Sequence, residues 1–157
     1  MGVINVDEYD IKSAIFRCYA EECSVVPRKV RIEHSVYGAI MKLSTEYEVT
    51  QNMIVRAAIK RVILCNYEVI KKIIDIGFKR MMTHVRVLEG SETVGFAVSN
   101  RDAAVVDLMS SSLGLRKADM YRWFIYKGLG EHVSSDRAYE VENIDYEIER
   151  RLDEYGR

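Results

Sequence analysis

Three charged side chains alternate with two apolar ones shortly after the single proline of this 157-residue chain. Lys29, Arg31 and Glu33 are separated by Val30 and Ile32, the period-2 pattern of a half-buried strand. If the apolar pair faces a core, the three charged side chains face outward. Lysine or arginine can donate to guanine O6 and N7, and glutamate can accept from cytosine N4. The segment therefore predicts a surface for base edges; the alternative is the solvent face of an ordinary edge strand.

A second polar cluster, Thr50, Gln51 and Asn52, stands where an apolar helical pattern begins. Thr50 can cap that helix, whose unpaired N–H groups and positive dipole end favour a phosphate. Further along the same helix, Lys60 and Arg61 could add non-specific phosphate contacts. We therefore expect this helix to contribute to binding an anionic polymer.

Apolar periodicity and capping residues predict the elements that position these side chains. The turn at 89–92 contains a glycine and predicts a hairpin between the strands on either side of it. The predicted strands are 28–34, 84–88 and 93–98, and the predicted helices are 7–22, 35–47, 51–64, 67–82, 100–112, 116–129 and 136–155.

Two stretches of the chain, 49–59 and 115–125, can be aligned with each other. Arg56 and Arg122 then share a position, and each stretch follows a helix and a short alternating strand. The alignment requires one inserted residue between the two helices of the second copy. The apolar pairs in register are Ile54/Met120, Val55/Tyr121, Ala58/Phe124 and Ile59/Ile125.

A strand followed by two helices, with V-T-Q-N-x-I-V-R-x-A-I opening the second helix, resembles the ribbon-helix-helix family, which includes the Arc and methionine repressors. The resemblance is good over 28–64 and moderate over 93–130. It implies that two units pair their strands into an antiparallel ribbon that enters the major groove of DNA. It also implies that outward ribbon side chains touch bases and that the second helix of each unit holds a phosphate.

The second copy departs from this pattern. Its outward strand residues would be Thr93, Gly95 and Ala97, which carry no charge. Thr93 could still touch a base or a thymine methyl group, and Arg116 with Lys117 could hold a phosphate. We expect this half to complete the ribbon with an asymmetric or half-site readout. Alternatively, its strand pairs only with 84–88 and the ribbon forms between two chains.

We therefore predict an α+β, mostly helical protein with tandem ribbon-helix-helix units and additional N- and C-terminal helices. Its expected function is sequence-specific binding of double-stranded DNA as a cytoplasmic transcriptional regulator such as a repressor, without cofactor, metal or catalytic residue. A homodimer or higher oligomer is compatible with this fold. The predicted segments are an acidic helix at 1–27, the first unit at 28–66, a linking helix and hairpin strand at 67–92, the second unit at 93–130 and an acidic helix at 131–157.

Charge and composition agree with that interpretation. The net charge is −1, yet residues 28–130 hold 17 basic and 10 acidic groups between acidic ends. No apolar run is long enough for a membrane span, and no signal peptide begins the chain. The three cysteines lack metal-ligand spacing and are expected to be free thiols. Scarce proline with abundant Ile, Val, Glu and Arg is compatible with a thermophilic source.

Two alternatives come from acidic residues. The first is a metal-dependent nuclease, in which the 84–107 region gathers a divalent ion. Its candidate ligands are His84, Glu89, Glu92, Asp102 and Asp107. The second is an antitoxin-like module that binds a protein partner through the helix at 136–155. Its anchors would be Val141, Ile144, Ile148 and Leu152, unless this stripe packs on the core of its own chain.

Overall fold

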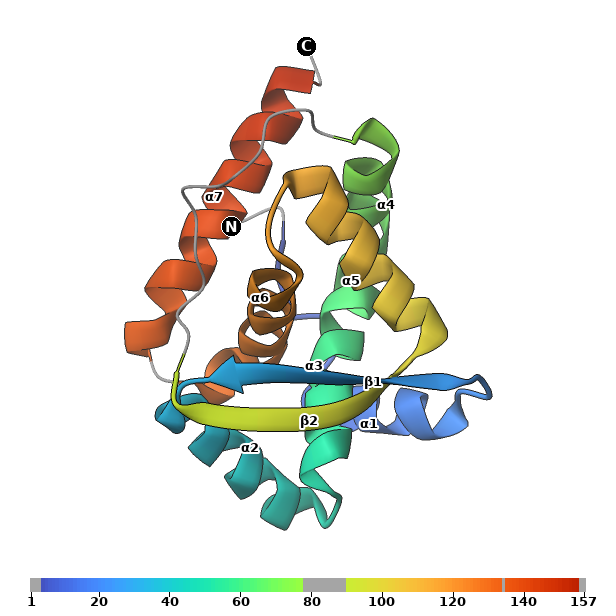
Figure 1. The fold of residues 1–157 in the computed structure, drawn as a ribbon, viewed down its shortest axis with the longest axis vertical. Coiled ribbons are helices and arrows are strands. Elements are labelled where there is room, and N and C mark those ends of the chain that lie inside the picture. Colours follow the sequence, from blue (N-terminus) through green and yellow to red (C-terminus); the bar gives the residue numbers. More distant parts are fainter. Residues whose placement is uncertain (1–3, 78–89, 134, 156–157) are drawn as a thin grey trace.

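The protein is mostly helical, with one two-stranded antiparallel sheet (Figure 1). The structure, a computed structural model, describes residues 4–77, 90–133 and 135–155. This confirms the predicted α+β class. The elements in chain order are α1 (Ile11–Ala20), β1 (Val25–Ile32), α2 (His34–Tyr47), α3 (Gln51–Cys65), α4 (Tyr67–Ile76), β2 (Glu92–Ser99), α5 (Asn100–Leu113), α6 (Lys117–Leu129), a 3-10 turn (Gly130–His132) and α7 (Ser135–Tyr155).

The two strands form a ribbon within one chain. β1 and β2 pair over their whole length, from Val25 opposite Ser99 to Ile32 opposite Glu92. The strand predicted at 93–98 therefore has β1 as its partner, and the alternative in which it pairs only with 84–88 is wrong. The predicted strand at 84–88 and the first residue of its turn, Glu89, lie outside the described residues.

Strand β1 begins earlier than predicted and includes Pro27, which lies opposite Ala97. The Ala97 N–H group donates to the side chain of Asn52 at 2.9 Å, rather than across the ribbon. Its N–H thus points to the outer edge, as it does in a non-hydrogen-bonded antiparallel pair. At such a position Pro27 removes no hydrogen bond from the ladder, so a proline is tolerated inside the strand.

The strand–helix–helix arrangement occurs twice with the same local geometry. Helices α2 and α5 each have 14 residues, and three residues separate each from the next helix. Both end in a left-handed residue, Glu48 at φ 55° and Gly114 at φ 70°. The hydroxyl of Ser44 donates to the Val49 carbonyl, and a matching bond runs from Ser110 to the Leu115 carbonyl. The inserted residue expected in the second copy is therefore absent.

The two units are intertwined around a central pair of helices. Helix α3 packs against α6, while α3 also contacts β2 and α6 contacts β1, so each unit's second helix lies on the other unit's strand. In Figure 1, α2 and α5 lie on opposite sides of the ribbon. The inward strand residues Val30, Ile32, Val94, Phe96 and Val98 are buried on these helices.

The remaining helices cover this core. Helix α1 packs on α3, α4 on α5, and α7 on α6. The carboxylate of Asp145 in α7 accepts hydrogen bonds from the Trp123 indole at 3.1 Å and from Lys127. No helix in the described ranges has the length and apolar character that a membrane span needs.

The apolar stripe of α7 faces inward. Ile144 and Ile148 have no exposed surface and Leu152 is 8% exposed. For these three residues the structure therefore shows the alternative in which the stripe packs on the core of its own chain. The Val141 side chain lies outside the described residues.

Helix α4 is shorter than predicted. It ends at Ile76, and Gly77 follows in the left-handed conformation that ends many helices. Residues 78–82, the remainder of the predicted helix, lie outside the described part of the chain.

Candidate nucleic-acid interface

The outer face of the ribbon carries two of the three charged side chains predicted for it. Lys29 and Arg31 are exposed on β1, and Thr93 and Gly95 are exposed on β2. Because their neighbours in each strand point into the core, these side chains share one face. The cross-strand neighbours on this face are Pro27/Ala97, Lys29/Gly95 and Arg31/Thr93.

Glu33 lies beyond the ribbon. It follows the last residue of β1 and precedes the first residue of α2, where it is half-buried. Its backbone N–H donates to the hydroxyl of Tyr126 at 3.2 Å. The strand ends at Ile32, where the chain turns into α2. The alternation therefore does not extend to Glu33, and this residue does not share the outer face with Arg31.

The start of α3 combines a capped backbone with exposed amides. The Thr50 side chain accepts from the Met53 N–H at 3.1 Å, which confirms the predicted cap. Gln51 and Asn52 are exposed, and Asn52 Oδ1 accepts from the Ala97 N–H of β2. This bond attaches the first turn of α3 to the ribbon edge, and the turn contains no acidic residue.

The start of α6 is different because it contains its own carboxylate. Asp119 is fully buried in the first turn and accepts from Arg116 at 2.7 Å and Arg122 at 3.0 Å. Arg122 also donates to the main-chain carbonyl of Arg31 at 3.2 Å. The buried acid therefore connects the predicted phosphate-binding Arg116 to the strand that carries Arg31.

A second ionic cluster, which the sequence does not predict, lies beside β1, near the start of α6. Arg28 donates to the Tyr121 hydroxyl at 3.0 Å and to Asp107 at 3.4 Å. Lys117, which is predicted to contact phosphate, lies 4.0 Å from the same carboxylate. The hydrogen bond with Tyr121 raises the pKa of Arg28 above its ordinary value, so this guanidinium stays charged. No local pattern could reveal the cluster, because its members come from β1, α5 and α6.

Lys60 and Arg61 do not belong to the interface. Lys60 is 7% exposed and forms ion pairs with Glu21 and Asp102. Arg61 is 3% exposed and donates to the carbonyls of Tyr9 and Gly128. The prediction that these two cations contact phosphate is therefore wrong.

The acids of the nuclease alternative are also engaged in ion pairs. Glu92 lies 3.0 Å from the ring of His34, Asp102 pairs with Lys60, and Asp107 pairs with Arg28. His84 and Glu89 lie outside the described residues. Among the residues that are described, no three His, Cys, Asp or Glu side chains come together as metal ligands would.

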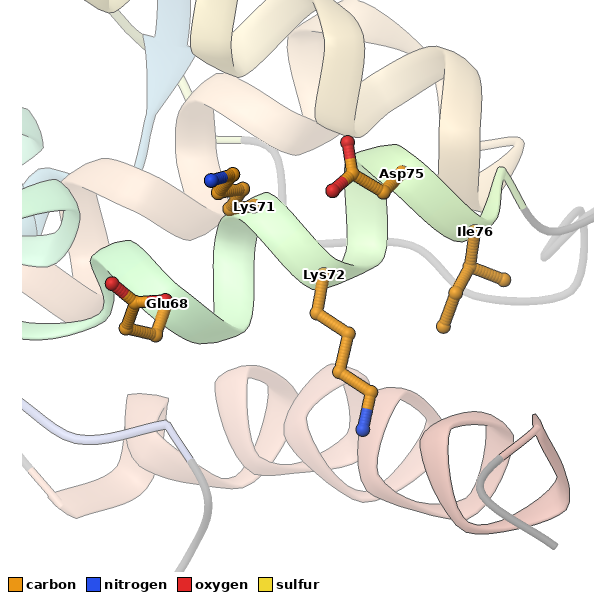
Figure 2. A pocket seen from close by; sticks show the side chains of 5 residues that line it. All are labelled: Glu68, Lys71, Lys72, Asp75 and Ile76. Carbon is orange, nitrogen blue, oxygen red and sulfur yellow. The ribbon is translucent and has the colours of Figure 1, made fainter.

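The cavity in Figure 2 is a shallow surface on α4 rather than part of the ribbon. Its charged lining contains both signs, with Lys71 and Lys72 between Glu68 and Asp75. All of its lining residues belong to α4.

Comparison of the chain with models of known protein families, with curated proteins and with solved structures finds no match.

Proposed function

We propose that this chain is a sequence-specific double-stranded DNA-binding protein, a transcriptional regulator that inserts the β1–β2 ribbon into the major groove. Its two repeats would be tandem ribbon-helix-helix units. The observation that carries the proposal is the two-stranded ribbon with Lys29, Arg31 and Thr93 on its exposed face, supported from behind by the paired helices α3 and α6.

The dimensions and chemistry of the ribbon suit this role. The major groove is about 12 Å wide and admits a two-stranded ribbon. Lys29 lies opposite Gly95, so no side chain on the neighbouring strand competes for the space into which it can extend. Arg31 supplies the forked donor that matches guanine O6 and N7, and the neighbouring Thr93 can contact a thymine methyl.

One chain contains both strands of this ribbon. In a unit made of two identical chains, the second strand would have to come from a partner. Here β1 and β2 pair intramolecularly, so a monomer can form a complete binding unit.

The direct test is selection of bound sites from a random duplex pool, followed by affinity measurement on the enriched site. Arg31→Ala should weaken binding by about tenfold or more, because one bidentate base contact contributes roughly 1–3 kcal/mol. The matched control is Lys71→Ala, which removes an exposed cation from α4. No enrichment and no retention of DNA at low salt would refute the proposal, as would equal effects of the two variants.

A further inference from the structure

We infer that the protein binds DNA in one direction, on a non-palindromic site, because the cations of its interface are concentrated at one end of the ribbon. This inference depends on the proposed function and specifies the kind of site that it recognises. The alignment that superimposes α2 on α5 and α3 on α6 also makes Lys29 equivalent to Gly95. These two residues lie opposite each other in the ribbon. The local twofold axis of the repeat therefore passes through this pair.

The two sides of that axis differ in chemistry. On one side Arg31 lies opposite Thr93, and on the other Pro27 lies opposite Ala97. In a symmetric ribbon each of these residues would occur at both ends. A duplex in the groove would thus meet a guanidinium and a hydroxyl on one side and two small apolar residues on the other.

The flank beside Arg31 adds more positive charge. Arg122 of α6 connects the helix to this end, and the helix starts with Arg116 as its N-cap and Lys117 as its first residue. Two carboxylates beside the start of α6 are each shared between two cations. Asp119 pairs with Arg116 and Arg122, and Asp107 pairs with Arg28 and Lys117. Two more carboxylates, Glu33 and Glu92, lie at this end of the ribbon. These four carboxylates are exceeded by the five cations Arg28, Arg31, Arg116, Lys117 and Arg122, and the side chain of Lys117 is 67% exposed.

The opposite flank is uncharged at three of the equivalent positions, and at the fourth Arg56, the counterpart of Arg122, is paired with Glu21. The sequence shift that aligns Glu48 with Gly114 gives the equivalent residues of the two units. It aligns Arg116 with Thr50, Lys117 with Gln51 and Asp119 with Met53. Asn52 connects this flank to Ala97 through an amide rather than a cation. DNA phosphates would therefore be attracted mainly at the Arg31 end, and reversing the duplex would not give an equivalent complex.

The test uses the equivalent positions Lys117 and Gln51 in the full chain, with the duplex enriched by selection as the probe. Each cation that neutralises a phosphate contributes about 0.9 to the slope of log affinity against log salt. Lys117→Ala should reduce that slope by about 0.9, whereas Gln51→Ala should leave it unchanged. Gln51→Lys should increase it by about the same amount. Arg101→Ala, which removes an exposed cation from the first turn of α5, should also leave the slope unchanged.

Hydroxyl-radical footprints of the same complexes test direction. For Lys117→Ala we expect lost protection on one flank of a non-palindromic site, the same flank in every complex. A palindromic enriched site, equal loss on both flanks, or a slope change for Arg101→Ala as large as for Lys117→Ala would overturn the inference and leave DNA binding intact. Absence of DNA binding by the unmodified protein would instead refute the proposed function.

Discussion

Gly128 lies where α6 crosses α3, and replacing it with alanine tests the central helix pair. A Cβ atom at this position would lie 1.9 Å from the carbonyl oxygen of Ala58, 2.4 Å from its carbonyl carbon and 2.8 Å from its Cα. All three are backbone atoms of α3, so no side chain can rotate away to make room. Helices α3 and α6 would have to move apart, although each also packs on a strand of the ribbon.

The expected cost follows from two opposing terms. Overpacking of a tight core costs about 1–3 kcal/mol, occasionally more, and a clash with backbone atoms belongs at the upper end of that range. Alanine has a better helix propensity than glycine by about 1 kcal/mol, which offsets part of the cost. Gly128→Ala should therefore destabilise the protein by about 2 kcal/mol or more. For a chain of this size that corresponds to a fall in Tm of roughly 4–8 °C.

Gly38 offers a control within the same molecule. It is an exposed residue of α2, and a Cβ added there would have no atom within 4 Å. Gly38→Ala should therefore stabilise the protein by up to about 1 kcal/mol through helix propensity alone. Thermal and urea unfolding followed by circular dichroism would measure both variants. If Gly128→Ala is as stable as the unmodified protein, the close crossing of α3 and α6 is wrong.

Two further predictions concern titratable groups near α1. Desolvation raises the pKa of Glu21, but hydrogen bonds from Lys60 and Arg56 outweigh it and lower the pKa below 4.5. Folding thus favours the ionised form of Glu21. The stability that this carboxylate contributes is present above pH 4.5 and is lost as the pH falls through the lower pKa of the folded state. Glu21→Gln should therefore reduce the loss of stability in acid, measured by urea titrations at several pH values. Burial raises the pKa of Cys18 to about 11, so mass spectrometry should find it alkylated far more slowly than Cys23 at pH 8, and equal rates would contradict its burial.

Local patterns in the sequence predicted much of the secondary structure correctly. The alternation around Val30 identified a strand with Lys29 and Arg31 outward, and Thr50 and Ser99 cap α3 and α5 as expected. The apolar pairs that aligned the two repeats are all buried. These features depend on side chains within a few residues of one another, so period and capping chemistry suffice to predict them.

The errors share a different physical origin. The local pattern predicts Lys60 as a surface cation because its helix neighbours do not reveal its partners, Glu21 at the end of α1 and Asp102 of α5. The supposed insertion in the second copy was also wrong, because the left-handed Glu48 and Gly114 produce identical turns despite their different side chains. In both cases, contacts or backbone geometry outweigh the local pattern.

The order of residues along the chain therefore accounts for which segments form helices and strands and which side of each is apolar. The order cannot show that β1 pairs with β2 in the same chain, or that Asp107 of α5 lies between Arg28 of β1 and Lys117 of α6. Pairing and charge distribution depend on which distant segments are brought together when the apolar surfaces are buried. That outcome is a property of the packed chain as a whole, and the proposed directional interface depends on it.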